Sequence, residues 1–468
     1  MLGKKSHYLA LIWLSIISIA FYSYWKLKAT PILILSILLN YFLSKKIIAS
    51  LNKKKILFII GVTLNLLILA YFKYVNFFIT NVNYLLESSN VEKINFLEAF
   101  IPLGISFFTF TQIGYLADSY QGKVKESNFL HYFIFVTFFP HLIAGPIINH
   151  NQIMPQFNDA KGIKFNSNLF AQGLSLFFIG LAKKIIIADS LATAANNFFD
   201  NASTIPVITF SDSWLGSLAF TFQLYFDFSG YSDMAVGLAL LFGIYLPLNF
   251  NSPLKAQSII DFWQRWHMTL TGYIGQYLYT PITLFFTRLS IGKSFIHEIL
   301  LNLATPTILI FLIIGFWHGA NWTFILFGLV HGVFVVTNHL WRKVKPIKTN
   351  GRVIAIIYWL ITLISVNIGF VLFRSKSTGE AIKIYKGMLN FFNFGSSQPQ
   401  LKLIILLILA ITISLKSKNS QEICGYVYPK SLIHPEKWSK LLAIFLGLIF
   451  LLSLLMIKKP TPFLYFNF

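Results

Sequence analysis

The stretch VIAIIYWLITLISVNIGFVLF, residues 353–373, decides the class of protein to which this chain belongs. No charged residue interrupts it, and as an α-helix it would rise about 30 Å, which is the thickness of the hydrocarbon core of a bilayer. We therefore predict a transmembrane helix over these residues and an integral membrane protein.

The composition supports the same class. The chain is 56% hydrophobic and 12% charged, whereas soluble domains have about half apolar and a quarter charged residues. We expect one polytopic domain over residues 1–468, embedded in membrane lipid. The net charge of +22 comes mainly from Lys runs beside apolar segments, which are typical of membrane-edge anchors, so no nucleic acid partner is expected.

Several apolar segments share the length or character of a span. The first follows a short basic start, and Tyr22, Tyr24 and Trp25 resemble an interfacial belt at its end, so we expect a retained helix there. The single Cys424 excludes a disulfide framework. The segments lie at about residues 8–25, 29–44, 56–72, 98–117, 129–147, 168–188, 214–226, 235–247, 301–317, 322–340, 353–373, 401–415 and 440–457.

Two segments are too polar to face lipid. Residues 226–233 mix aromatic residues with Asp, Gly and Ser, and residues 262–279 mix them with Arg, His and Gly. Lipid tolerates such backbone only where protein buries it, so broken or re-entrant helices are predicted.

Small polar loops are expected at about 189–213 and 376–400. The Lys runs at 53–55 and 342–348 favour the cytoplasm, although Lys in most other loops leaves the topology open.

Ionisable residues inside a membrane protein need a partner, a cavity or a chemical role. In DFWQRWHMTL (261–270), Asp261 and Arg265 are four residues apart and are predicted to neutralise each other on one helical face inside the protein. His267 follows them, with Trp263 and Trp266 close by.

A second polar stretch is IGFWHGANWTFILFGLVHG (314–332), in which His318 ends an apolar span. Gly319 and Ala320 would let a backbone or thin ligand approach closely, and Asn321 could bond to the imidazole or to a carbonyl substrate. His318 and His267 are candidates for a general base, because the ordinary pKa of His lies near neutrality, but buried structural histidines would have the same surroundings. The 13-residue separation places His331 on a different face, where a structural role is favoured.

Other catalytic signatures are absent. His297 and Glu298 begin an HExxH-like string, but Leu301 replaces the second His. No Walker A loop, nucleophile elbow or Cys/His metal spacing is present, and no bound metal is expected. FDFSGYSD (226–233) offers Ser beside Asp, although a buried helix break is favoured over a nucleophile.

Five motifs in order resemble the membrane-bound O-acyltransferase family, particularly its bacterial branch of alginate and peptidoglycan O-acetyltransferases and the teichoic acid D-alanyl transfer protein. The resemblance covers most of the chain. The motifs are IPLGISFFTFTQIGYLADSY (101–120), FFPHLIAGPIINH (138–150), FDFSGYSDMAVGLALLFGIYLPLNFNSP (226–253), DFWQRWHMTL (261–270) and FWHGANWTFILFGLVHG (316–332).

The resemblance implies an all-α membrane fold, with a ring of about eleven or more helices and re-entrant segments around a transmembrane tunnel. It assigns the catalytic histidine to His318 and an assisting one to His267. An acyl group, expected to be acetyl from acetyl-CoA, would pass from the cytoplasm across the bacterial inner membrane to an envelope polysaccharide, often through a secreted or anchored SGNH-type partner. We further expect tunnel or substrate contacts from Asp261, Trp263, Arg265, Trp266, Trp317, Asn321 and Trp322.

One region departs from the family pattern. Close relatives carry Arg and Asp after the RWH string, where this chain has Gly275 and Gln276, so charged roles are not carried over to this helix.

Peptidoglycan is the favoured acceptor, and alginate or another exopolysaccharide is the alternative. Two alternatives come from other functional classes. One is a transporter or channel that passes acyl groups or glycans without chemistry at His318, and the other is a scaffold for a secreted transferase.

Overall fold

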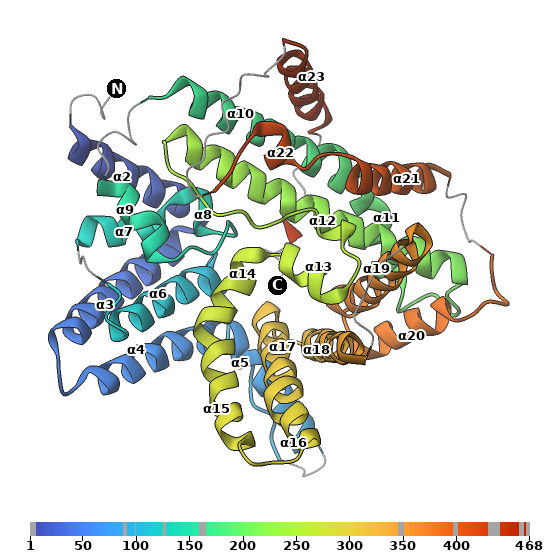
Figure 1. The fold of residues 1–468 in the computed structure, drawn as a ribbon, viewed down its shortest axis with the longest axis horizontal. Coiled ribbons are helices and arrows are strands. Elements are labelled where there is room, and N and C mark those ends of the chain that lie inside the picture. The colour runs from blue at the N-terminus through green and yellow to red at the C-terminus, as the bar shows by residue number, and fades with distance from the viewer. Residues whose placement is uncertain are drawn as a thin grey trace. The chain divides into compact units, whose positions relative to one another are not determined.

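The computed structural model describes residues 6–87, 91–98, 100–124, 128–158, 165–344, 351–395, 401–428, 440–457 and 463–464. Throughout these ranges the regular elements are helices (Figure 1). The all-helical membrane fold predicted from the sequence is therefore confirmed. The chain divides into two units, one formed mainly by residues 1–174 and the other mainly by residues after 174.

Five helical stretches among the described residues are long and apolar enough to span a membrane. The predicted span at 353–373 is one of them, and its helix begins and ends at the charged residues that flank the apolar run. The stretches are His7–Ala49, Lys54–Leu86, Phe295–His318, Trp322–Val344 and Arg352–Arg374.

The first unit is built from helices that pair their few polar residues with each other. Asn40 and Asn65 lie on neighbouring helices, and their side-chain amides exchange hydrogen bonds of 2.6 and 3.2 Å. Asp118 and His150, from two of the motifs, form a buried contact of 2.9 Å. The elements are α2 (His7–Lys26), η1 (Leu27–Ala29), α3 (Thr30–Ala49), α4 (Lys54–Leu69), η2 (Ala70–Tyr74), α5 (Val75–Leu86), α6 (Ile105–Tyr120), α7 (Phe129–Thr137), α8 (Phe139–Leu142) and α9 (His150–Asn158).

Helices α10 (Ser167–Ala182) and α12 (Phe210–Leu241) run through the boundary between the units. The second unit holds the candidate site. Its other elements are η3 (Lys183–Ala188), α11 (Asp189–Asn201), η4 (Pro253–Lys255), α13 (Ile259–Arg265), α14 (Met268–Ile274), η5 (Gly275–Tyr279), α15 (Thr280–Ser290), α16 (Phe295–Ile299), η6 (Leu300–Ala304), α17 (Thr305–His318), α18 (Trp322–Val344), α19 (Arg352–Arg374), α20 (Thr378–Met388), α21 (Leu401–Lys416), α22 (Ser420–Cys424) and α23 (Lys440–Met456).

An antiparallel hairpin organises the second unit (Figure 1). Its first arm runs from α14 through η5 to α15, and its second arm returns from α16 through η6 to α17. Both arms contain a π-helical turn, and such turns are frequent near functional sites. His267 stands directly before the first arm and His318 ends the second, so the hairpin brings both candidate histidines to the same end.

The predicted break at 226–233 is wrong, because α12 is one continuous helix through this motif. Its acidic residues are instead neutralised by a neighbouring π-turn. Lys183 contacts Asp233 at 2.6 Å and Lys184 contacts Asp227 at 2.6 Å. Since buried charges are tolerated when they are paired, the polar motif reflects ion pairs between helices. The break predicted within 262–279 is confirmed between α13 and α14.

The two predicted polar loops are also partly wrong. Residues 189–213 contain α11, and residues 376–400 contain α20; residues 396–400 lie outside the described part of the chain. Both helices bury an apolar side and expose polar residues; in α20, Ala381 and Ile384 are buried and Lys386 is exposed. The polar composition that predicts a loop here belongs to one face of each helix.

Candidate functional site

Helices α17 and α18 place His318 through a close crossing. Gly315 packs against the carbonyl of Phe324, and Gly328 packs against the carbonyl of Phe311, so neither position has room for a Cβ. Backbones come this close only through small residues. The chain turns between the two helices immediately after His318, which is held at the end of α17.

The imidazole of His318 is buried in an aromatic surrounding. The residue is 5% exposed. Its ring centroid lies 5.0 Å from Trp317, 5.1 Å from Phe373 of α19 and 6.0 Å from Phe327 of α18. These rings restrict water around the imidazole, which is the setting in which an activated ester would be protected from hydrolysis.

His267 occupies the break between α13 and α14. Its backbone has φ 44°, a left-handed conformation that non-glycine residues seldom adopt. The residue is 1% exposed, and its Nδ1 lies 2.9 Å from Oδ1 of Asn249. Such strain is maintained only where the surrounding structure fixes it, as at functional sites.

Asn249 determines which nitrogen of His267 could act as a base. The Asn249 Oδ1 also accepts a hydrogen bond from Thr269 Oγ1 at 2.7 Å, while its Nδ2 donates to Ser232 Oγ at 3.2 Å. With the amide oriented in this way, Nδ1 of His267 is the donor to Oδ1. The neutral ring then carries its acceptor lone pair on Nε2.

Trp263 and Trp266 belong to an aromatic cluster between α13, α18 and α19. The indole of Trp263 donates to Nδ1 of His331 at 3.3 Å, and its ring meets that imidazole edge-on. Trp266 lies 5.3 Å from Phe370, which also contacts His331. His331 is fully buried and packs against Gly369 of α19. Its contacts agree with the structural role favoured by the sequence.

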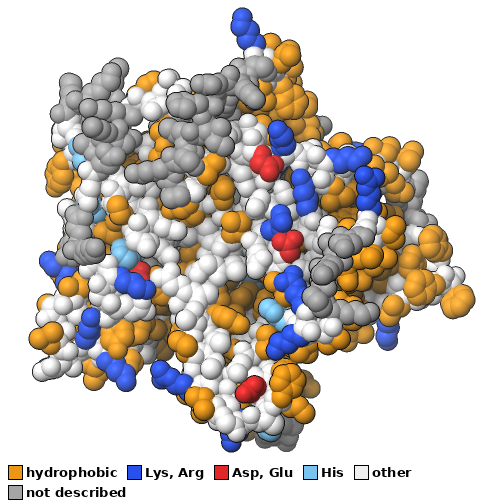
Figure 2. Space-filling view, in the orientation of Figure 1, with side chains coloured by type: hydrophobic (Ala, Val, Ile, Leu, Met, Phe, Trp, Pro, Cys, Tyr) orange, Lys and Arg blue, Asp and Glu red, His pale blue; other side chains and the backbone are white. Residues whose placement is uncertain are grey.

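Asp261 and Arg265 form the predicted i,i+4 pair, with Nε of Arg265 2.7 Å from Oδ1 of Asp261. The side chains are 32% and 35% exposed respectively, so the pair is at a surface, contrary to the prediction that it lies inside the protein. In the second unit, Figure 2 shows Lys and Arg side chains gathered over the region of α13, α21 and α22, with few acidic ones. Asp261 and Arg265 therefore form part of the partly exposed surface of α13.

Asn321 and Trp322 lie where the chain enters α18, and their predicted contacts with a tunnel or substrate stay a prediction. The Asn321 amide donates to the carbonyl of Lys376 at 3.1 Å and accepts from the backbone N–H of Thr323 at 3.1 Å, so it caps α18 and ties it to the end of α19. Trp322 is 53% exposed. Next to this end, hydrogen bonding to Lys376 keeps the pKa of Asp200 below its ordinary value.

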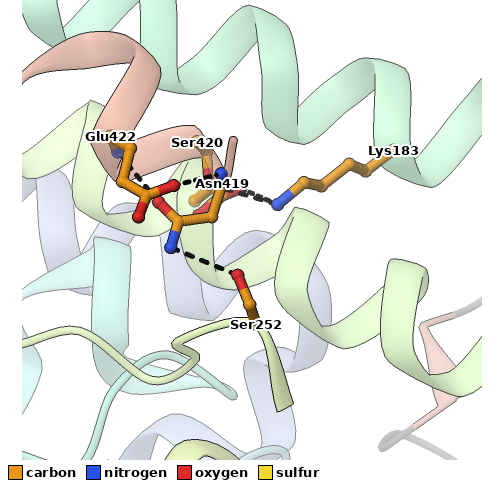
Figure 3. A network of polar contacts seen from close by, with 6 residues as sticks. Lys183, Ser252, Asn419, Ser420 and Glu422 are labelled. Atoms are coloured by element: carbon orange, nitrogen blue, oxygen red, sulfur yellow. Dashed lines mark hydrogen bonds and ion pairs between the residues drawn. The ribbon is translucent and has the colours of Figure 1, made fainter. Parts of the chain in front are cut away.

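Sequence reasoning missed the lysines that hold this part of the unit together. Besides contacting Asp233, Lys183 donates to Ser420 Oγ at 3.1 Å, and Asn419 reaches Ser252 Oγ at 3.3 Å while its side chain caps α22 with Glu422 (Figure 3). Lys183 and Lys184 interrupt the apolar segment 168–188. Two cations within a span were the available signal, because each requires a partner.

Comparison with known proteins gives consistent matches. The model of the membrane-bound O-acyltransferase family matches residues 19–375. The peptidoglycan O-acetyltransferase of Helicobacter pylori is 41% identical, over 81% of this chain and 73% of its own length. A probable alginate O-acetylase of Pseudomonas aeruginosa is 36% identical, over 82% and 70%. A teichoic acid D-alanyltransferase of Bacillus subtilis is 31% identical, over 58% and 69%.

Proposed function

Because this chain belongs to the membrane-bound O-acyltransferase family, we propose that it passes an acetyl group across the bacterial inner membrane for O-acetylation of peptidoglycan. The chain is a multi-pass membrane acyltransferase. Acetyl-CoA is the proposed donor, on the cytoplasmic side. Peptidoglycan is preferred because the relative named for that activity is 41% identical, against 36% for the alginate relative from Pseudomonas aeruginosa.

The observation that carries the proposal is the placement of two buried histidines at one end of one hairpin. In the proposed reaction, His318 takes the proton of an attacking hydroxyl, and the oxygen bonds to the acetyl carbonyl carbon. The carbon–sulfur bond to coenzyme A breaks, and the thiolate recovers the proton from the imidazolium. His267, fixed by Asn249, assists at the same end.

Asn321 lies at the same end of α18 as His318 and is hydrogen-bonded to the carbonyl of Lys376. Arg342 and Lys343 lie at the other end of α18, and a positive flank favours the cytoplasm. His318 would then lie toward the outer side, where an envelope polysaccharide is available. An SGNH-type transferase in the envelope is proposed to receive the acetyl group when the glycan is not acetylated directly.

The test compares two histidines of the same hairpin. A strain lacking the gene is complemented with the wild type, His318→Ala or His297→Ala, and ester-linked acetate released by mild alkali is measured on isolated peptidoglycan. His297 is exposed near the hairpin tip, so its replacement controls for loss of an imidazole. We expect His318→Ala to lose nearly all ester and His297→Ala to keep it, at equal protein in the membrane.

Alginate or another exopolysaccharide is the second candidate acceptor, supported by several alginate O-acetylases at 34–37% identity. The same strains decide between acceptors. Ester that depends on His318 in the exopolysaccharide fraction but not in peptidoglycan would select this alternative. Full acetylation with His318→Ala at normal protein level would reject a catalytic role for His318 and favour transport without chemistry.

A further inference from the structure

A cavity of 370 Å³ lies between the start of α13 and the basic halves of α18 and α19. It is separate from the histidines of the hairpin. Its residues come from three elements that are tied together, because Arg342 Nη2 donates to Ser258 Oγ at 2.8 Å and the Trp359 indole donates to the carbonyl of Leu254 at 2.8 Å. These two hydrogen bonds therefore hold the walls of the cavity together.

The lining changes in character along the cavity. Arg342 does not itself line the cavity, but its Nη2 reaches Ser258 at one end of the lining, where Trp341 lies on the rim. One turn further in are Asn338 and Tyr358, followed by Phe334 at the level of Ser365. From Arg342 to Phe334 is about 12 Å along α18 at the usual helical rise. The cavity thus has a cation beside one end, and its lining passes inward from neutral polar to apolar side chains.

The hydroxyl groups at the inner end are already bonded within α19. Thr362 Oγ1 donates to the carbonyl of Tyr358 at 2.7 Å, and Ser365 Oγ donates to the carbonyl of Ile361 at 2.8 Å. Because their hydroxyl protons are already used in these hydrogen bonds, the two side chains present mainly carbon atoms to the cavity. Together with Phe334 they form a wall suited to hydrocarbon.

The middle of the cavity holds a side-chain oxygen that accepts no hydrogen bond from the described residues. Asn338 Oδ1 is buried with no hydrogen-bond partner among those residues. Leaving such an oxygen unpaired is unfavourable, so a ligand that supplies a donor or an ordered water is favoured there. Trp341 and Ile361 are 45% and 55% exposed on the rim, which leaves an opening on the lipid-facing side of the helices.

We propose that this cavity binds one anionic glycerophospholipid. The phosphate contacts Arg342, the hydroxyl-bearing head group and glycerol esters contact Asn338 and Tyr358, and the upper part of one acyl chain lies against Phe334 and Ile361. The cavity holds only this part of the molecule, and the chains continue into the bilayer through the open rim. Basic pockets between helices at the cytoplasmic side are suited to anionic lipids.

Native mass spectrometry of the full chain, released from mixed micelles of phosphatidylglycerol or phosphatidylcholine, tests the proposal. We expect one retained phosphatidylglycerol per protein and no comparable phosphatidylcholine adduct. Arg342→Gln should lower the affinity about tenfold, the loss expected for one charged hydrogen bond. Lys343→Gln, which removes the neighbouring charge, is the matched control and should bind as the wild type does.

A second pair of variants tests the position of the chain. Thr362→Phe fills the inner wall, whereas Ile364→Phe adds the same ring at a position that is 41% exposed. We expect the adduct to be lost only from Thr362→Phe; if that variant fails to fold, the Arg342 and Lys343 pair decides. Equal retention of both lipids, equal loss in the two charge variants, or displacement of phosphatidylglycerol by coenzyme A would overturn the proposal.

Discussion

At the scale of single residues, the two candidate histidines have unlike supports. His318 is surrounded by aromatic rings at a helix end, whereas His267 is oriented by an amide hydrogen bond in a left-handed backbone conformation. The sequence could suggest both positions because polar residues inside a membrane protein are costly. It could not indicate Asn249, since the contact joins residues 18 apart through a chain reversal.

Asn249 is predicted to be a positioning residue for His267. Asn249→Leu should lower acetylation by about tenfold, the loss expected for one buried hydrogen bond, because the imidazole loses the acceptor that fixes its ring and tautomer. Asn249→Asp, which keeps an acceptor oxygen, should restore part of the activity. Acetyl ester per unit of membrane-inserted protein is the measurement. Equal activity in Asn249→Leu and the wild type would remove this role.

At the scale of elements, sequence patterns located helices better than they located helix breaks. The apolar run at 353–373 matches α19 closely, because it holds no charged residue and its buried Asn367 is hydrogen-bonded to Ser217 and Thr221. The run at 226–233 predicts a break that α12 does not have, because its Asp residues are paired with Lys183 and Lys184 from another helix. A single segment does not reveal a partner that approaches from elsewhere in the chain.

The close crossing of α17 and α18 gives a prediction for two glycines. Gly328→Ala should destabilise the protein by several kcal/mol, because its Cβ would collide with the carbonyl of Phe311 and force the helices apart. Gly272→Ala on α14 meets no atom within 4 Å and should be neutral or slightly stabilising. Thermal unfolding in detergent, followed by size-exclusion chromatography, measures both. Equal unfolding temperatures would contradict the importance of the crossing.

At the scale of the whole molecule, composition alone indicated a polytopic membrane protein, and the structure and family match agree. The ring of helices, the tunnel, the donor and the acceptor remain predictions. They depend on the orientation of the chain in the bilayer. The basic end of α18 favours the cytoplasm, and His318 lies beside the opposite end of that helix. The direction of acetyl transfer follows from that orientation.

The most direct measurement uses sealed proteoliposomes in which the basic end of α18 faces the bath. Labelled acetyl-CoA is added to the bath and peptidoglycan glycan strands are enclosed in the lumen. We predict label on the enclosed glycan with the wild type and with His297→Ala, and none above protein-free vesicles with His318→Ala. Transfer by His318→Ala at the wild-type rate, or no transfer by the wild type, would contradict direct catalysis from acetyl-CoA at His318.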